Sequence, residues 1–314
     1  SMIIESWLNE RATNESRGAI FSFYISITLF GVVGGQMMVP FADVSTPILF
    51  MICGILYCLA IIPTAVSRAA SPQPLKRVRL DLKGLYRNSP VSFIAILLIG
   101  TANGAYGTLV AVFGARAGLT EDMIAIMVSV TILAGAVAQF PAGRLSDRMD
   151  RRYVLAGLAG LGAVAGVGLS LFQPANVYMI LILVSLYGAA ANALYPIAVA
   201  HANDHASSED FVKISGGLLL LYGVGTIIGP TLGGPVMTWL GPHALFAVTA
   251  LSHILVTAYA IFRSRIRAPV PVEERDSYAG SPALAPSLTT PESLLLNPRA
   301  AEGGSDQDQE RTAS

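Results

Sequence analysis

The sequence predicts an all-α fold: a polytopic transmembrane helical bundle with about eight spans. Hydrophobic residues make up 53% of the 314-residue chain and charged residues only 13%, whereas a soluble domain carries roughly a quarter charged residues. The apolar residues form stretches long enough to cross a hydrocarbon core of about 30 Å. Lys and Arg gather in alternate loops between these stretches. The formal net charge is zero, so the composition gives no indication of a nucleic-acid partner.

The predicted spans are the ranges 18–40, 46–67, 91–113, 121–142, 153–172, 177–200, 213–238 and 242–263. Each is rich in Gly, Ala and Ser, and such small residues let helix backbones approach closely in lipid, so we expect a packed bundle. Cys53 and Cys58 share one span and would point in different directions on a helix. We therefore expect neither a disulfide between them nor a metal site. Residues 1–15 are polar, so no cleavable signal peptide is expected.

The basic residues give an orientation. One set of loops contains most of them: Arg11, Arg17, Arg68, Lys76, Arg77, Arg79, Lys83, Arg87, Arg144, Arg148, Arg151, Arg152, Lys213, Arg263, Arg265 and Arg267. The opposite loops contain only Arg116. Because basic loops stay on the cytoplasmic side, we expect both chain termini in the cytoplasm. The linker 68–90 would then lie beside the anionic leaflet, and the Pro- and Ser-rich residues 264–314 would form a disordered cytoplasmic tail.

A short charged segment, 143–152, separates the spans 121–142 and 153–172. Gly143 would permit a tight turn there, and Asp147 can accept hydrogen bonds from neighbouring arginines or from a helix N-terminus. The pattern G-x-L-S-D-R-x-D-R-R resembles the loop signature of major facilitator superfamily transporters. The resemblance implies a cytoplasmic gate, formed by Gly143, Asp147, Arg148, Arg151 and Arg152, that holds helices together in one state and releases them in another. The alternative is that these charges only set the topology.

Residues 3–13 contain the stretch E-S-W-L-N, which resembles a YcaD-like bacterial subfamily of the same superfamily. Displacing the chain by about 194 residues pairs Gly31 with Gly225 and Gly35 with Gly229, which agrees with the repeated halves of such transporters. The resemblance implies that 1–67 ends the N-half with helices five and six, and that 68–90 is the central linker. Range 91–263 would be the C-half with helices seven to twelve. Four of twelve helices would then be missing unless another chain supplies them, so we expect the isolated product to be unstable or to oligomerise.

A glycine-rich motif lies in the span 213–238, and it comprises Gly225, Gly229, Pro230, Gly233 and Gly234. It resembles the Gly-Pro motif of facilitator antiporters, although it lies in the repeat-equivalent helix. Glycines allow close helix packing, and Pro230 removes a backbone hydrogen bond and permits a bend. The motif would suit rocking of one bundle against another. Plain small-residue packing is the alternative.

Polar side chains within spans are the candidates for a substrate path, because each is costly in lipid unless it has a partner or contacts water. Asn103 is the first candidate, with Tyr106 about one turn away on a similar face. The others are Gln36, Gln139, Asn192, Tyr195 and Tyr222. An interhelical hydrogen bond is the alternative role for the amides. No span centre holds an Asp, Glu, Lys or Arg. His253 could titrate near neutral pH, but a packing role is the simpler interpretation.

The predicted function is secondary active transport of an unidentified small molecule by alternating access, in a bacterial inner membrane. The lipid bilayer and the substrate would be the partners. No catalytic pair, nucleotide-binding motif or metal-ligand spacing is present in the sequence, so we expect no enzyme activity, cofactor or metal. The alternative is a truncated, non-transporting membrane protein that acts as a partner or scaffold.

Overall fold

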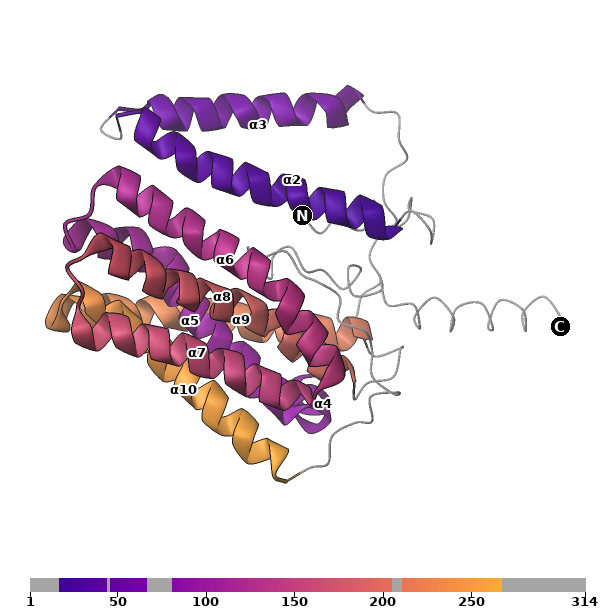
Figure 1. Cartoon of the computed structure of the whole chain (residues 1–314). Helices are drawn as coiled ribbons and strands as arrows, with labels where there is room; N and C mark the ends of the chain where they lie inside the picture. Colours follow the sequence, from indigo (N-terminus) through magenta and orange to yellow (C-terminus); the bar gives the residue numbers. More distant parts are fainter. Residues whose placement is uncertain (1–16, 44–45, 67–80, 205–210, 267–314) are drawn as a thin grey trace.

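The structure is a computed structural model that describes residues 17–43, 46–66, 81–204 and 211–266. Its elements are α2 (Arg17–Met38), η1 (Val39–Phe41), α3 (Ile48–Val66), α4 (Leu82–Asn88), α5 (Pro90–Arg116), α6 (Glu121–Arg148), α7 (Arg151–Phe172), α8 (Val177–Asn203), α9 (Phe211–Leu240), η3 (Pro242–Ala244) and α10 (Leu245–Ser264). None of the described residues forms a strand. This confirms the predicted all-α fold class (Figure 1).

Six of the described helices, α5 to α10, are long and apolar enough to cross a membrane. The shorter apolar stretches 26–41 and 48–63 correspond to α2 with η1 and to α3. The predicted spans agree with these helices within a few residues at most ends. Most of the predicted tail 264–314, most of the predicted linker 68–90 and the E-S-W-L-N stretch lie outside the described residues.

Local sequence explains where several helices begin. Ser89 caps α5 by accepting a hydrogen bond from the backbone N–H of Ser92, and Pro90 occupies the first helical position, where a missing N–H costs little. Asn176 caps α8 in the same way by accepting from the N–H of Tyr178, 2.9 Å away. These caps fix the connections that bring successive spans side by side.

The six long helices form the bundle, in which α5 packs most extensively against α9, α7 against α10, and α6 against α8. The helices α2 and α3 form an outer pair, and α2 contacts α6 (Figure 1). Nearly every described side chain of α3 is exposed, including Phe50 and Tyr57. The buried core of the described residues therefore lies in α5 to α10, with Leu85 of α4 packed into it.

The α5–α9 contact depends on glycine from both helices. A Cβ atom at Gly100 would lie 2.5 Å from the Tyr222 carbonyl oxygen, and one at Gly104 would lie 2.5 Å from the Thr226 Cα. Cβ atoms at Gly225 and Gly229 would meet the α5 backbone at Leu97 and Thr101. Such reciprocal small-residue contacts let two membrane helices touch through their backbones. By contrast, no atom lies within 4 Å of the Cβ position at Gly234.

Candidate functional site

The connection between α6 and α7 is shorter than the sequence pattern predicts. α6 continues to Arg148, so Gly143 is a buried helical residue and the prediction that it forms a tight turn is wrong. The connection consists of Met149 and Asp150 only. The apolar run ends at Ala142, but a helix ends where its backbone hydrogen bonds end, and charged residues are compatible with a helix end that leaves the membrane. Asp150 caps α7 by accepting from the N–H of Arg152, 3.0 Å away.

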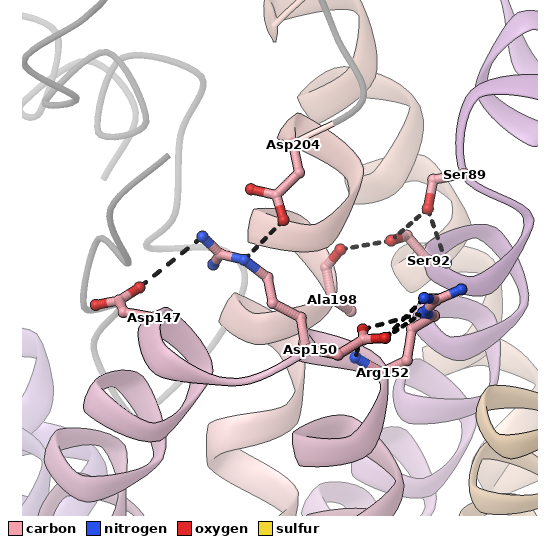
Figure 2. A network of polar contacts seen from close by, with 8 residues as sticks. Ser89, Ser92, Asp147, Asp150, Arg152, Ala198 and Asp204 are labelled. Atoms are coloured by element: carbon pink, nitrogen blue, oxygen red, sulfur yellow. Dashed lines mark hydrogen bonds and ion pairs between the residues drawn. The ribbon is translucent and has the colours of Figure 1, made fainter. Parts of the chain in front are cut away.

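Among the described charged residues at this end of the bundle, Arg151 is the most deeply buried, with only 1% of its side chain exposed. Its Nε lies 2.8 Å from Oδ2 of Asp204, which directly follows α8, and the Asp204 side chain is 3% exposed. Its other contact, between a terminal guanidinium nitrogen and Asp147 Oδ1, is 3.8 Å long. Arg151 therefore connects the end of α6, the start of α7 and the end of α8 (Figure 2).

Arg152 forms a second arm of the network. Its guanidinium donates to both carboxylate oxygens of Asp150, with a shortest distance of 2.6 Å. It also donates to the Arg263 carbonyl oxygen, 3.2 Å away at the end of α10. Such charge-assisted pairs are stronger than hydrogen bonds between neutral groups. We call Asp147, Asp150, Arg151, Arg152 and Asp204 the ion-pair network. Arg148, which was expected in the gate, is exposed at the end of α6.

The carboxyl group of Asp150 responds to two opposing influences. Partial burial alone would raise its pKa, but hydrogen bonds from Arg152 and the positive charges of Arg152 and His201 outweigh burial, so the pKa lies below its ordinary value. A carboxylate with a lowered folded-state pKa stabilises the fold above the unfolded pKa, near 4, and loses this contribution as the pH falls through the folded value.

We expect Asp150→Asn to lower the midpoint of thermal unfolding in detergent at pH 6 to 8. Asparagine is also a good N-cap, so the substitution removes the charge and retains the cap. The difference from the unsubstituted chain should shrink as the pH falls from about 4 through the lowered pKa of folded Asp150, and it should vanish once Asp150 is protonated in both the folded and the unfolded state. A difference that is equally large in strong acid would contradict an electrostatic origin.

The C-terminal end of α8 also accepts hydrogen bonds from α4 and α5, on the side that faces away from the ion-pair network. The Ser92 hydroxyl donates to the Ala198 carbonyl at 2.6 Å, and the Asn88 amide donates to the Ala202 carbonyl at 3.0 Å. Ser89 donates in turn to the Ser92 hydroxyl at 2.9 Å (Figure 2). The last turn of α8 is thus held by neutral groups on one side and by the ion-pair network on the other.

Three of the predicted substrate-path residues come together from three helices. The Asn103 side chain of α5 makes a polar contact with the Tyr222 side chain of α9. The Tyr222 ring packs edge-on against the Tyr195 ring of α8, with 5.2 Å between centroids. Asn103 and Tyr222 are half-buried, whereas Tyr195 is buried.

Tyr106 lies elsewhere, in a buried aromatic cluster. Its hydroxyl is 2.7 Å from the Thr131 hydroxyl, and its ring centroid is 4.9 Å from that of Tyr187. Three residues along a helix correspond to about 300°, so Tyr106 is rotated by roughly 60° from Asn103. Tyr106 therefore contacts a different set of residues from Asn103, and its place in the substrate path stays a prediction.

The remaining candidates occupy different places. Asn192 donates to the Gly188 carbonyl within α8 and, at 3.4 Å, to the Thr131 carbonyl of α6. Gln139 is buried on α6, and its amide nitrogen has no hydrogen-bond partner among the described residues. Gln36 is half-buried on α2. His253 is fully buried, with its ring edge-on to Tyr187 at 5.5 Å.

The sequence analysis did not identify two residues that lie at the same end of the bundle as the ion-pair network. Asp204 and His201 follow an apolar run and match no motif, so only their nearness to an arginine-rich loop in the folded chain reveals them. A single acidic residue at the end of a span is the weak signal that could have identified Asp204. Within the described residues, no group of three His, Cys, Asp or Glu side chains is placed to hold a metal ion.

Comparisons with known proteins agree with this architecture. The family model described as Major Facilitator Superfamily matches residues 92–301. The chain is 26% identical over 256 residues to the uncharacterised MFS-type transporter YcaD of Escherichia fergusonii, covering 79% of this chain and 64% of that protein. It is 28% identical over 267 residues to an uncharacterised MFS-type transporter of Yersinia pestis, with the same coverage of 79% and 64%. The chain thus spans less than two thirds of the length of these curated relatives.

Proposed function

The chain belongs to the major facilitator superfamily, and we propose that it is part of a secondary active transporter that moves a small molecule by alternating access. It is an integral membrane protein, with six apolar helices of spanning length among the described residues. The names of its relatives support a transporter rather than an enzyme. The proposed location is a bacterial inner membrane, with the basic loops and both chain termini in the cytoplasm.

The ion-pair network is the observation that carries this proposal. It ties the end of α6 and the start of α7 to the ends of α8 and α10 through two buried arginines. A transporter that alternates between two openings needs contacts that form at one face in one state and break in the other. We assign that role to Asp147, Arg151 and Asp204, with Arg152 and Asp150 holding α7 to α10.

The proposed substrate path contains Asn103, Tyr222 and Tyr195, since their neutral polar groups converge from α5, α9 and α8. Asn192 is a weaker candidate, because its side chain already has backbone partners. Gln36 and Gln139 are further candidates of the proposed path. Under this proposal 91–263 is the C-terminal half, and α2 and α3 belong to the N-terminal half. The rest of that half would come from further helices or from another chain.

Transport by the whole protein gives a direct test. Cells that produce it are compared with vector controls for accumulation of a broad compound panel, and one compound whose accumulation depends on the protein becomes the assay. We expect Asp147→Asn to lower its initial uptake or efflux rate several-fold at equal membrane abundance, because the variant weakens the contact with Arg151. Asp122→Asn, an exposed acidic residue in the first turn of α6, is the matched control and should retain the rate.

The two parts of the proposal can fail separately. An unchanged rate in Asp147→Asn would remove the gate assignment but leave the transporter assignment intact. If no compound depends on the protein while a stable protein partner co-purifies with it, the transporter assignment itself is contradicted.

A further inference from the structure

The short helix α4 is held against three of the long helices at the end of the bundle where α5 begins. Leu85, 3% exposed, packs on α9 at Gly217, where an added Cβ atom would lie 2.9 Å from Leu85 Cδ2. The Asn88 amide donates to a backbone carbonyl of α8 at 3.0 Å. The Tyr86 ring meets the Phe93 ring of α5 edge-on, with 5.4 Å between centroids. These contacts fix the position of α4 and leave one side of it uncovered by the described residues.

The uncovered side of α4 carries two adjacent rows of side chains. Successive residues of a helix are rotated by roughly 100°, so positions four apart share a row, and the rows opposite Leu85 point away from the bundle. Leu82 and Tyr86 form an apolar row and are 38% and 46% exposed. Lys83 and Arg87 form a basic row beside it, and both are exposed. An apolar row next to a basic row is typical of a helix that lies at a membrane–water interface.

The two cations of α4 form no ion pair with any described residue. The ion pairs in the described part of the chain all involve the two arginines at the start of α7. Asp81, the acidic residue next to α4, caps this helix by accepting from the Gly84 N–H at 2.8 Å. Residues two apart do not face each other on a helix, so the Asp81 carboxylate is not placed to neutralise Lys83. The basic row therefore presents two neighbouring positive charges outward.

We propose that α4 binds the headgroups of anionic phospholipids, with Lys83 and Arg87 on the phosphate groups and Leu82 and Tyr86 toward the acyl chains. One residue separates α4 from α5, a helix of membrane-spanning length, so α4 lies at the level of the headgroups. A guanidinium group forms paired hydrogen bonds with a phosphate, and tyrosine is enriched at membrane interfaces.

The lipid site is narrower than the expectation from sequence, which places the whole linker 68–90 beside the anionic leaflet. The contacts of α4 hold two cations of that linker in fixed, adjacent positions on a docked helix. Lipid binding here does not require transport. The assignment of the site to the cytoplasmic leaflet rests on the proposed orientation, whereas the site itself does not.

Hydrogen exchange in lipid nanodiscs tests the lipid site on the full 314-residue chain. Backbone exchange of residues 82–88 is measured in phosphatidylcholine, and then with increasing fractions of phosphatidylglycerol that has the same acyl chains. We expect protection to rise with the phosphatidylglycerol fraction. Lys83→Gln and Arg87→Gln should each shift the midpoint about fivefold toward more phosphatidylglycerol, because one cation near an anionic surface contributes about 1 kcal/mol. The double variant should show no protection that depends on phosphatidylglycerol.

Controls separate the lipid site from a general effect of charge. Lys83→Arg keeps the charge and should keep the midpoint. Arg116→Gln removes an exposed cation at the other end of α5 and should also keep it. Three results would overturn the proposal: no dependence on phosphatidylglycerol in the unsubstituted chain, a dependence that persists in the double variant, or equal protection by inorganic phosphate in phosphatidylcholine. Because exchange is read without substrate, each result is independent of whether the protein transports the assay compound.

Discussion

Asp204→Asn is expected to destabilise the bundle by about 3–5 kcal/mol, the cost of leaving a buried charge without its partner. The Arg151 guanidinium is 1% exposed and lies 2.8 Å from the Asp204 carboxylate. It cannot escape the cost by losing its proton, because arginine stays charged in proteins. A second carboxylate among the described residues, that of Asp147, is 3.8 Å away and 41% exposed, so it compensates only in part. Thermal or denaturant unfolding in detergent measures the effect.

A double variant separates the cost of the buried charge from the loss of the pair. Arg151→Leu combined with Asp204→Leu removes both charges, and replacing a buried ion pair by apolar residues is often neutral or stabilising. We therefore expect the double variant to be more stable than Asp204→Asn alone. Asp122→Asn, at an exposed acidic residue, should unfold like the unsubstituted chain. If Asp204→Asn also unfolds like the unsubstituted chain, the buried pair does not contribute to stability.

The bundle could be predicted from sequence because a span needs a minimum apolar length, and this length is visible in the chain. The predicted range 153–172 nearly coincides with α7, and 91–113 lies within α5. The end of α6 could not be predicted in this way, because backbone hydrogen bonding continues to Arg148 beyond the apolar run. The cap that starts α7 is Asp150, a residue that the loop pattern contains but whose role depends on local geometry.

The candidate site was predictable only in part, for a related reason. The charged loop pattern identified Asp147, Arg151 and Arg152, since they are close together in the chain. The partners Asp204 and Arg263 are distant in sequence and meet them only because α8 and α10 pack against α7. The amide at Asn103 was recognised as polar within a span, but its contact with Tyr222 depends on how α5 crosses α9.

Gly225→Ala is expected to destabilise the chain by about 1–3 kcal/mol, the usual cost of overpacking a well-packed core. A Cβ atom there would meet the Leu97 carbonyl oxygen and lie 2.8 Å from the Thr101 backbone nitrogen. Both are backbone atoms of α5, which cannot rotate away as a side chain would. The two helices would have to separate, and the neighbouring close contacts at Gly100 and Gly104 would loosen with them. The free energy of unfolding in detergent measures this loss.

Gly223→Ala on the same helix is the matched control, since no atom lies within 4 Å of its Cβ position. Alanine has a higher helix propensity than glycine by roughly 1 kcal/mol, so this variant should be as stable as the unsubstituted chain or more stable. The two substitutions are chemically identical and are expected to act in opposite directions. Equal effects would mean that helix propensity alone determines how these two substitutions in α9 change the free energy of unfolding. Opposite effects would mean that the close backbone contact between α5 and α9 holds these two helices together.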